Sequence, residues 1–135
     1  MTGSTRYLLD TNILSALARN PQGSVADHIR QKGEASLCTS VVVACEVQFG
    51  LTKSGSVALR DRMERILGTI LTLPLEPPVE RHYADIRWEL EKTGKPIGPN
   101  DLLIAAQARR LGLTVVTDNV EEFQRVPGLA VENWL

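Results

Sequence analysis

Four acidic residues that lie far apart in the sequence each stand in or beside an apolar run. They are Asp10 in YLLDTN, Glu46 in VVVACEVQFG, Asp101 in GPNDLLIAA and Asp118 in TVVTDN. A carboxylate among apolar side chains is unfavourable unless a positive charge compensates it. No matching cluster of basic residues accompanies these segments, and hard cations such as Mg²⁺ and Mn²⁺ prefer oxygen ligands of this kind. The pattern therefore predicts a divalent-cation site and metal-dependent chemistry on phosphate.

The rest of the chain alternates short apolar segments with segments of helical pattern. Strands are expected at residues 7–9, 35–39, 70–75, 114–117 and 130–132, and helices at 12–19, 24–32, 41–52, 57–69, 79–92 and 100–111, with a short turn or helix at 121–123. This alternation predicts an α/β fold with a parallel sheet covered on both faces. The helices expected at 41–52 and 57–69, which Ser54-Gly55-Ser56 separates, are expected to form a helical hairpin. Ligands of such sheets bind beyond the carboxyl ends of the strands, where Asp10 and Asp118 are expected to meet.

Composition and charge set broad limits on the function. The 135 residues suit a single domain spanning 1–135, and the net charge of −1 is unlike that of a general high-affinity DNA binder, although it does not exclude a nuclease. Cys38 and Cys45 have apolar neighbours and are expected to be reduced core thiols. The start of the chain lacks the apolar core of a signal peptide, and no run approaches the ~18 apolar residues of a membrane span. A cytoplasmic, soluble protein is expected.

Most of the acids also have a structural interpretation. Asp10 and Asp101 precede or open helices, where aspartate is a favoured N-cap. Asp118 precedes an asparagine, and this pair favours a turn. Glu121 and Glu122 are expected to be solvated. No one of these positions is decisive, and the prediction of a site depends on their convergence.

Glu46 has the most informative position of the four acids. On a helix, its neighbours at −4, −3 and +3 are Val42, Val43 and Phe49, so the carboxylate points along an apolar face. A surface ion pair would instead place a basic residue four positions away, although Lys53 might reach the same side. We interpret Glu46 as a site residue, with a structural ion pair as the alternative.

The segments LLDTNILSAL, SVVVACEVQFGL, IGPNDLLIAAQARRLGLTVVTDNVEEF and VPGLAVENW resemble the PIN-domain ribonucleases, and among them the VapC-type toxins of toxin–antitoxin pairs. Together they span nearly the whole chain. The resemblance implies a three-layer α/β/α fold with a central parallel sheet of about five strands. It also implies Mg²⁺ or Mn²⁺ bound by Asp10 and Asp101, with Glu46 nearby.

One position departs from the family's pattern. The usual fourth acid lies two residues after Thr117, where this chain has Asn119. Asp118 is the intervening residue, and we take it as the fourth catalytic acid beside Asp10, Glu46 and Asp101. Asn12, Thr117 and Asn119 are expected to orient the acids or water.

The function that the resemblance implies is that of a metal-dependent endoribonuclease toxin, inhibited by a cognate antitoxin and present as a homodimer. The segments IGPNDLLIAA and VTDN…EFQRVPGL look most like those of toxins that cut a transfer RNA. An acid-only site predicts attack by water, leaving a 5′-phosphate, because neither His28 nor His82 lies near the acids in sequence. The alternative is a PIN-fold RNA- or protein-binding module with weak catalysis, which Asn119 keeps open.

Overall fold

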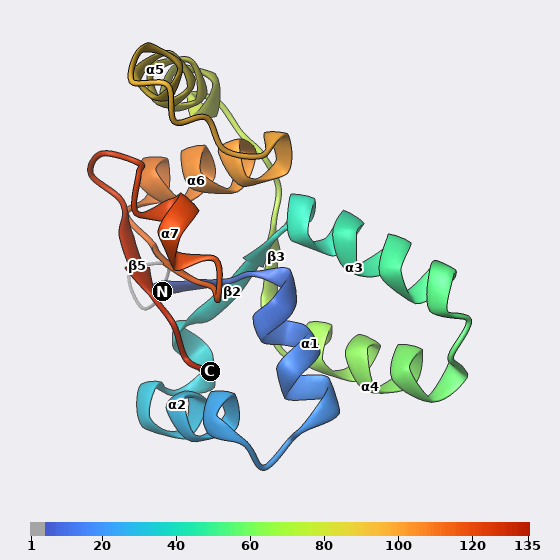
Figure 1. Cartoon of the computed structure of the whole chain (residues 1–135). Helices are drawn as coiled ribbons and strands as arrows, with labels where there is room; N and C mark the ends of the chain where they lie inside the picture. The colour runs from blue at the N-terminus through green and yellow to red at the C-terminus, as the bar shows by residue number, and fades with distance from the viewer. Residues whose placement is uncertain (1–4) are drawn as a thin grey trace.

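Five short parallel strands form the centre of the computed structural model, which describes residues 5–135 (Figure 1). The strands are β1 (Tyr7–Leu9), β2 (Leu37–Ser40), β3 (Leu71–Leu73), β4 (Thr114–Val116) and β5 (Ala130–Glu132). They lie in the order β3-β2-β1-β4-β5. The chain therefore runs outward from β1 to β3 and then returns to the other side of β1. The carboxyl ends of β1 and β4 flank the point where this direction reverses, which is where ligands bind in such sheets.

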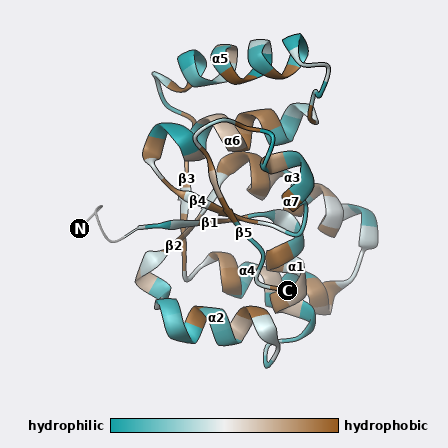
Figure 2. Ribbon diagram, turned by 60° about the vertical axis from the view of Figure 1, so that its left-hand side comes forward, coloured by the Kyte–Doolittle hydropathy of each residue, from teal (hydrophilic) through white to brown (hydrophobic). Residues whose placement is uncertain are grey.

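Helices cover both faces of the sheet and confirm the three-layer α/β/α architecture. Figure 2 shows α6, with α5 outside it, on one face and α1, α2 and α4 on the other. In Figure 1, α3 and α4 extend sideways as the expected helical hairpin. The helices are α1 (Thr11–Arg19), α2 (Ser24–Lys32), α3 (Val41–Ser54), α4 (Val57–Leu67), α5 (Val79–Lys92), α6 (Pro99–Leu111) and α7 (Val120–Phe123), with a 3-10 turn, η2 (Glu34–Ser36), before β2.

The core lies where the central strands meet the helices. Leu8, Leu9, Val115 and Val116 are all buried, so β1 and β4 have no solvent-facing side, as expected of central parallel strands. On α6, the small side chains at residues 105, 106 and 108 are also fully buried. They let the helix lie close to the sheet, and this close approach brings the first turn of α6 to the strand ends.

The cysteine prediction is half wrong. Cys38 is buried in β2, but Cys45 is exposed on α3. The buried face of α3 is set by Val43, Val47 and Leu51, which recur at intervals of four, and Cys45 falls outside this stripe. An apolar neighbourhood in sequence therefore did not decide which side of the helix faces the core.

Most predicted elements agree with the structure within a few residues. The second strand begins two residues later than expected, because residues 34–36 form the 3-10 turn η2. In the part of the chain that the structure describes, no helix has the length and apolarity to cross a membrane. Residues 1–4, part of the segment expected to lack a signal peptide, lie outside the described residues.

Candidate active site

A polar hollow of about 400 Å³ lies at the carboxyl ends of β1 and β4. All four predicted acids contribute to it, from four different parts of the chain. Its lining consists of Asp10, Thr11, Asn12, Glu46, Asp101, Asp118 and Asn119. The topology thus brings together side chains that are up to 109 residues apart in sequence.

Asp10 is the most deeply placed acid, with 7% of its surface exposed. Its Oδ1 accepts a hydrogen bond from the backbone N–H of Thr11 at 2.8 Å, and its Oδ2 accepts one from the Thr117 hydroxyl at 2.9 Å. Asp10 is also the N-cap of α1, as the structural interpretation expected, and it lines the hollow as well. Burial raises the pKa of Asp10 and the charges of Glu46 and Asp118 raise it further, although the two hydrogen bonds oppose this.

Glu46 reaches the hollow from α3 and is half-buried. Its Oε1 accepts a hydrogen bond from the Thr11 hydroxyl at 2.8 Å, and its Oε2 accepts a longer one from the Asn100 amide at 3.4 Å. No lysine or arginine within residues 5–135 forms an ion pair with it. The alternative interpretation as a structural ion pair therefore has no support in the described residues.

Asp101 lies in the first turn of α6, and the Asn119 side-chain amide that donates to it also donates to Glu122. Oδ2 of Asp101 accepts from this amide at 3.2 Å. Burial is the main reason that its pKa rises to about 7, followed by the contact with Glu122 and the charges of Asp10, Glu122 and Glu46. Asp101 is thus a buried acid among other acids, and no basic side chain is among the causes that set its pKa.

Asp118 and Asn119 point in different directions. Asp118 is exposed at the rim, where its Oδ1 accepts a hydrogen bond from the Asn12 amide at 2.9 Å. Asn119 is half-buried, and its backbone N–H donates to the Thr117 hydroxyl at 3.0 Å. The assignment of Asp118 as the fourth catalytic acid remains a prediction, and its side chain is the most exposed of the four.

The sequence-based prediction missed Glu122. This residue was expected in solvent, but it is half-buried and its Oε2 accepts a hydrogen bond from the Asn119 amide at 2.6 Å. The i, i+3 spacing of Asn119 and Glu122 at the start of a helix was the signal that could have found it. Asn100, which contacts Glu46, was missed as well.

The donor set fits a hard divalent cation. Carboxylate and amide oxygens surround the hollow. Burial first, and then the charges of neighbouring acids, raise the pKa values of Asp10 and Asp101, and a bound cation would favour the ionised form of both. None of the seven ion pairs within residues 5–135 involves an acid of this site. In the same range, no three Asp, Glu, His or Cys side chains are already arranged to hold an ion.

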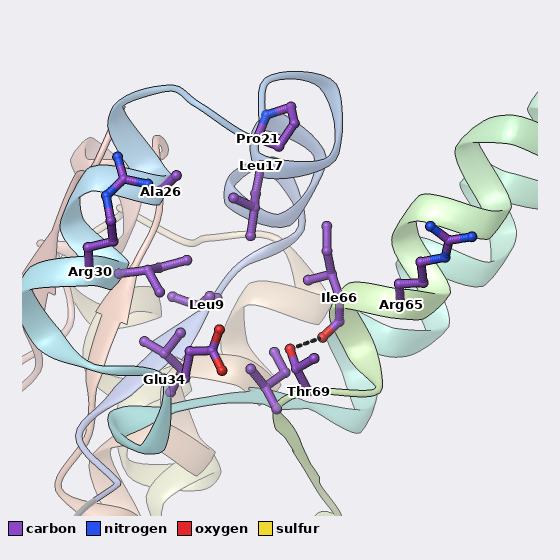
Figure 3. A pocket seen from close by; sticks show the side chains of 12 residues that line it. Leu9, Leu17, Pro21, Ala26, Arg30, Glu34, Arg65, Ile66 and Thr69 are labelled. Carbon is purple, nitrogen blue, oxygen red and sulfur yellow. Dashed lines mark hydrogen bonds between the residues drawn. The ribbon is translucent and has the colours of Figure 1, made fainter.

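A second hollow, of about 380 Å³, lies between α1, α2, α4 and the sheet (Figure 3). Most of its lining is aliphatic, including Leu17 and Ile66, and the carboxylate it contains is that of Glu34. The Thr69 hydroxyl donates to the carbonyl of Ile66 at 2.8 Å beside it. Without a group of acids, this hollow is not suited to metal-dependent hydrolysis.

Comparisons with known proteins agree on one family. The family model described as PIN domain matches residues 7–129. Over 134 residues the chain is 34% identical to Ribonuclease VapC2 of Haemophilus influenzae, covering 96% of this chain and 98% of the relative. It is 35% identical to the tRNA(fMet)-specific endonuclease VapC of Shigella flexneri, covering 96% and 98%. The VapBC2 complex of Rickettsia felis, bound to a promoter DNA fragment, contains a chain with a TM-score of 0.89 and 30% identity, covering 97% of this chain and all of that one.

Proposed function

The chain belongs to the PIN-domain family, and we propose that it is a metal-dependent endoribonuclease toxin that hydrolyses RNA phosphodiester bonds. The observation that carries this proposal is the convergence of Asp10, Glu46 and Asp101 on one polar hollow at the carboxyl ends of β1 and β4. These acids have no basic partners within residues 5–135, so their charges are available to a cation.

Asp10 and Asp101 are the residues that would hold Mg²⁺ or Mn²⁺, with Glu46 beside them. When bound, the cation activates water and offsets negative charge on the phosphodiester. Asp10 is suited to a fixed ligand role, because the hydrogen bonds from Thr11 and Thr117 hold both of its oxygens in place. An orientation fixed in advance avoids the loss of side-chain freedom when the cation binds.

Glu46 is the acid best placed to accept a proton from the attacking water. The Thr11 hydroxyl orients its Oε1, whereas the contact from Asn100 to Oε2 is long, at 3.4 Å. The second oxygen is therefore only weakly engaged and has lone pairs left for a water molecule. A positioned carboxylate of this kind serves as a general base.

The histidines do not offer a competing mechanism. His28 stacks on Trp134, and His82 accepts a hydrogen bond from the Arg109 guanidinium at 3.1 Å. Neither lines the acidic hollow. Water attack without a histidine base leaves a 5′-phosphate and a 3′-hydroxyl, whereas attack by the 2′-hydroxyl would leave a cyclic phosphate.

We extend the proposal to substrate and partners from the names of the relatives. Two of them, from Shigella flexneri and Salmonella typhimurium, are called tRNA(fMet)-specific endonucleases, so a transfer RNA is the proposed substrate. The similar solved structures include VapBC complexes, so a cognate antitoxin is the proposed inhibitor. The homodimer and the cytoplasmic location expected from the sequence are part of the same proposal.

Cleavage of total bacterial RNA tests the substrate. Purified protein with Mg²⁺ should cut one or a few transfer RNAs at a single position, and sequencing of the cut ends should detect 5′-phosphates. Random degradation of all RNAs would contradict a specific target. Cyclic-phosphate ends would contradict attack by water.

A further inference from the structure

A third hollow, of about 640 Å³, lies between the loop that follows α5 and the helix α7. Its lining brings two basic side chains and one acid together with neutral polar groups. The residues that matter here are Thr93, Lys95, Pro96, Glu121, Gln124 and Arg125. None of them lines the acidic hollow. We call this third site the basic hollow.

The positive charges of the basic hollow are available to an anion. Lys95 is exposed and forms no ion pair within residues 5–135. The Arg125 guanidinium is 3.9 Å from the carboxylate of Glu121, whose side chain is 91% exposed. So long and so exposed an ion pair contributes little free energy, and water screens it. An incoming anion can therefore displace Glu121 from Arg125 at small cost.

Arg125 is already held in place. Its Nη1 donates a hydrogen bond to the carbonyl of Pro96 at 3.1 Å, and its side chain is 30% exposed. This hydrogen bond joins the end of α7 to the loop that carries Lys95, so the two cations belong to segments that are fixed to each other. A guanidinium presents several N–H donors in a planar fork, and this geometry matches the oxygens of a phosphate.

The basic hollow lies next to the acidic hollow. Asn119, the N-cap of α7, lines the acidic hollow, and Gln124, the C-cap, lines the basic hollow. The helix between them has four residues, which span ~6 Å at about 1.5 Å per residue. The loop makes a second connection, because Pro96 precedes Asp101 by five residues. A polynucleotide chain that occupies one hollow can therefore extend into the other.

The chemistry of the basic hollow fits an RNA backbone better than a base. No aromatic side chain lines it, whereas single-stranded bases are usually stacked on aromatic rings. Contacts from lysine and arginine to phosphate supply much of the affinity of proteins for nucleic acids. Such contacts are needed here, because the net charge of the chain is −1 and the acids of the acidic hollow repel phosphate.

Resting on the proposed function, we propose that Lys95 and Arg125 bind a backbone phosphate of the RNA substrate beside the scissile bond. They are positioning residues, because they hold the RNA across α7 while the acidic hollow carries out the cleavage. Contacts to phosphate carry no sequence information. The basic hollow thus contributes affinity for RNA and does not select the target.

Binding of unfractionated bacterial transfer RNA to the full chain tests this assignment. The affinity is measured over a range of salt concentrations in EDTA, so that the RNA stays intact. Lys95→Gln and Arg125→Gln each remove one charge, and Arg125→Lys keeps the charge without the planar fork. Lys92→Gln is the matched control, because Lys92 is exposed, pairs with Glu89 at 3.0 Å and does not line the basic hollow.

We expect Lys95→Gln and Arg125→Gln to bind transfer RNA at least about threefold more weakly than the wild type at low salt. Each should also reduce the slope of log affinity against log salt by about 0.7–0.9, the effect of one lost phosphate contact. Arg125→Lys should lose less than Arg125→Gln. Lys92→Gln should bind like the wild type, and Glu121→Gln should bind more tightly, because it removes the acid beside Arg125.

Cleavage with Mg²⁺ gives a second measure of the same role. In Lys95→Gln and Arg125→Gln, KM should rise while kcat and the position of the cut stay the same. Thermal unfolding reports on the fold, because Arg125→Gln also loses the hydrogen bond to Pro96. The exposed side chain of Lys95 has no such structural contact among the described residues, so Lys95→Gln separates RNA binding from stability.

An unchanged affinity and salt dependence in both glutamine variants would overturn the assignment. A fall in kcat without a change in KM would overturn it as well, since these residues would then act on the chemical step. In either case the nuclease proposal stands as long as the wild type cuts RNA with Mg²⁺. A wild type that does not cut RNA would instead refute the proposed function.

Discussion

The Thr117 hydroxyl donates a 2.9 Å hydrogen bond to Oδ2 of Asp10, joining residues that are 107 positions apart. Both residues are buried. Each directly follows a strand, and the two strands are neighbours in the sheet. The same hydroxyl oxygen accepts from the backbone N–H of Asn119 at 3.0 Å. Thr117 therefore links the deepest acid of the site to the segment that carries Asp118, Asn119 and Glu122.

Replacing Thr117 by valine should reduce both stability and cleavage. Thr117→Val keeps the shape of the side chain but removes both hydrogen bonds, and the cost should be about 1–3 kcal/mol in the free energy of unfolding. Because Asp10 then loses the donor that orients it, we expect kcat/KM for RNA cleavage to fall at least about tenfold. Urea unfolding and a cleavage assay measure the two effects.

Thr39→Val is the matched control. Thr39 is also fully buried, and its hydroxyl donates to the carbonyl of Leu9 at 2.7 Å, but it does not line the hollow. Its replacement should lower stability by a similar amount and leave kcat/KM unchanged. Equal losses of cleavage in the two variants would mean that Thr117 acts through stability alone.

The orientation of Glu46 should depend on the Thr11 hydroxyl. Thr11→Val removes the 2.8 Å hydrogen bond to Oε1 of Glu46, whereas Thr11→Ser keeps a hydroxyl that can donate to it. Both variants keep the backbone N–H that donates to Asp10. If Glu46 is the general base, kcat should fall in Thr11→Val with little change in KM, and Thr11→Ser should remain close to the wild type. A serine variant as impaired as the valine variant would be inconsistent with this role.

The raised pKa of Asp101 predicts how stability without metal changes with pH. Its pKa is about 7 in the folded protein and near the ordinary 3.8 in the unfolded chain. Between these values the folded state binds more protons than the unfolded state, so the free energy of unfolding falls as pH rises through this range. The contribution of Asp101 is fully present below the unfolded value and is lost above about pH 7.

Urea unfolding in a chelating buffer at about pH 5.5 and about pH 8 measures this dependence. Asp101→Asn cannot titrate at this position, so the wild type should lose more stability than the variant between the two pH values. An identical pH dependence in both proteins would contradict the shift.

The two cysteines should differ in reactivity. Burial raises the pKa of the Cys38 thiol to about 12, so its thiolate is scarce near neutral pH, whereas Cys45 is exposed. A thiol reagent such as Ellman's reagent should modify one thiol of the native protein rapidly and the second only after unfolding. Cys45→Ser should remove the rapid phase, and a rapid phase that persists in this variant would refute the assignment.

Sequence reasoning predicted the positions of Asp10 and Asp101 from physical features that are local. Apolar strands without alternation indicate a parallel sheet, and acids at strand ends or helix starts must lie at one edge of it. Glu46 could be placed because Val42 and Val43, four and three residues before it, are apolar and are buried in the structure, although Phe49 on the expected apolar side is 70% exposed. For these residues, secondary structure largely determines position.

The surroundings of Asp118, Asn119 and Glu122 could not be predicted in the same way. After β4 the chain turns and forms a helix of only four residues, and the direction of each side chain depends on how that helix is anchored. The anchor is the buried ring of Phe123, a tertiary contact with no local signature. The exposure of Cys45 likewise depends on how α3 is rotated against the sheet.

The most direct test of the account is RNA cleavage by the wild type and Asp10→Asn, each with Mg²⁺, with EDTA, and with Mg²⁺ restored in excess after EDTA. We expect the wild type to cut with Mg²⁺, to stop with EDTA and to recover when Mg²⁺ returns, while Asp10→Asn stays inactive throughout. The variant should remain folded, because asparagine can still cap α1. Cleavage that is equal in both proteins, or that persists with EDTA, would contradict a metal-dependent nuclease at this site.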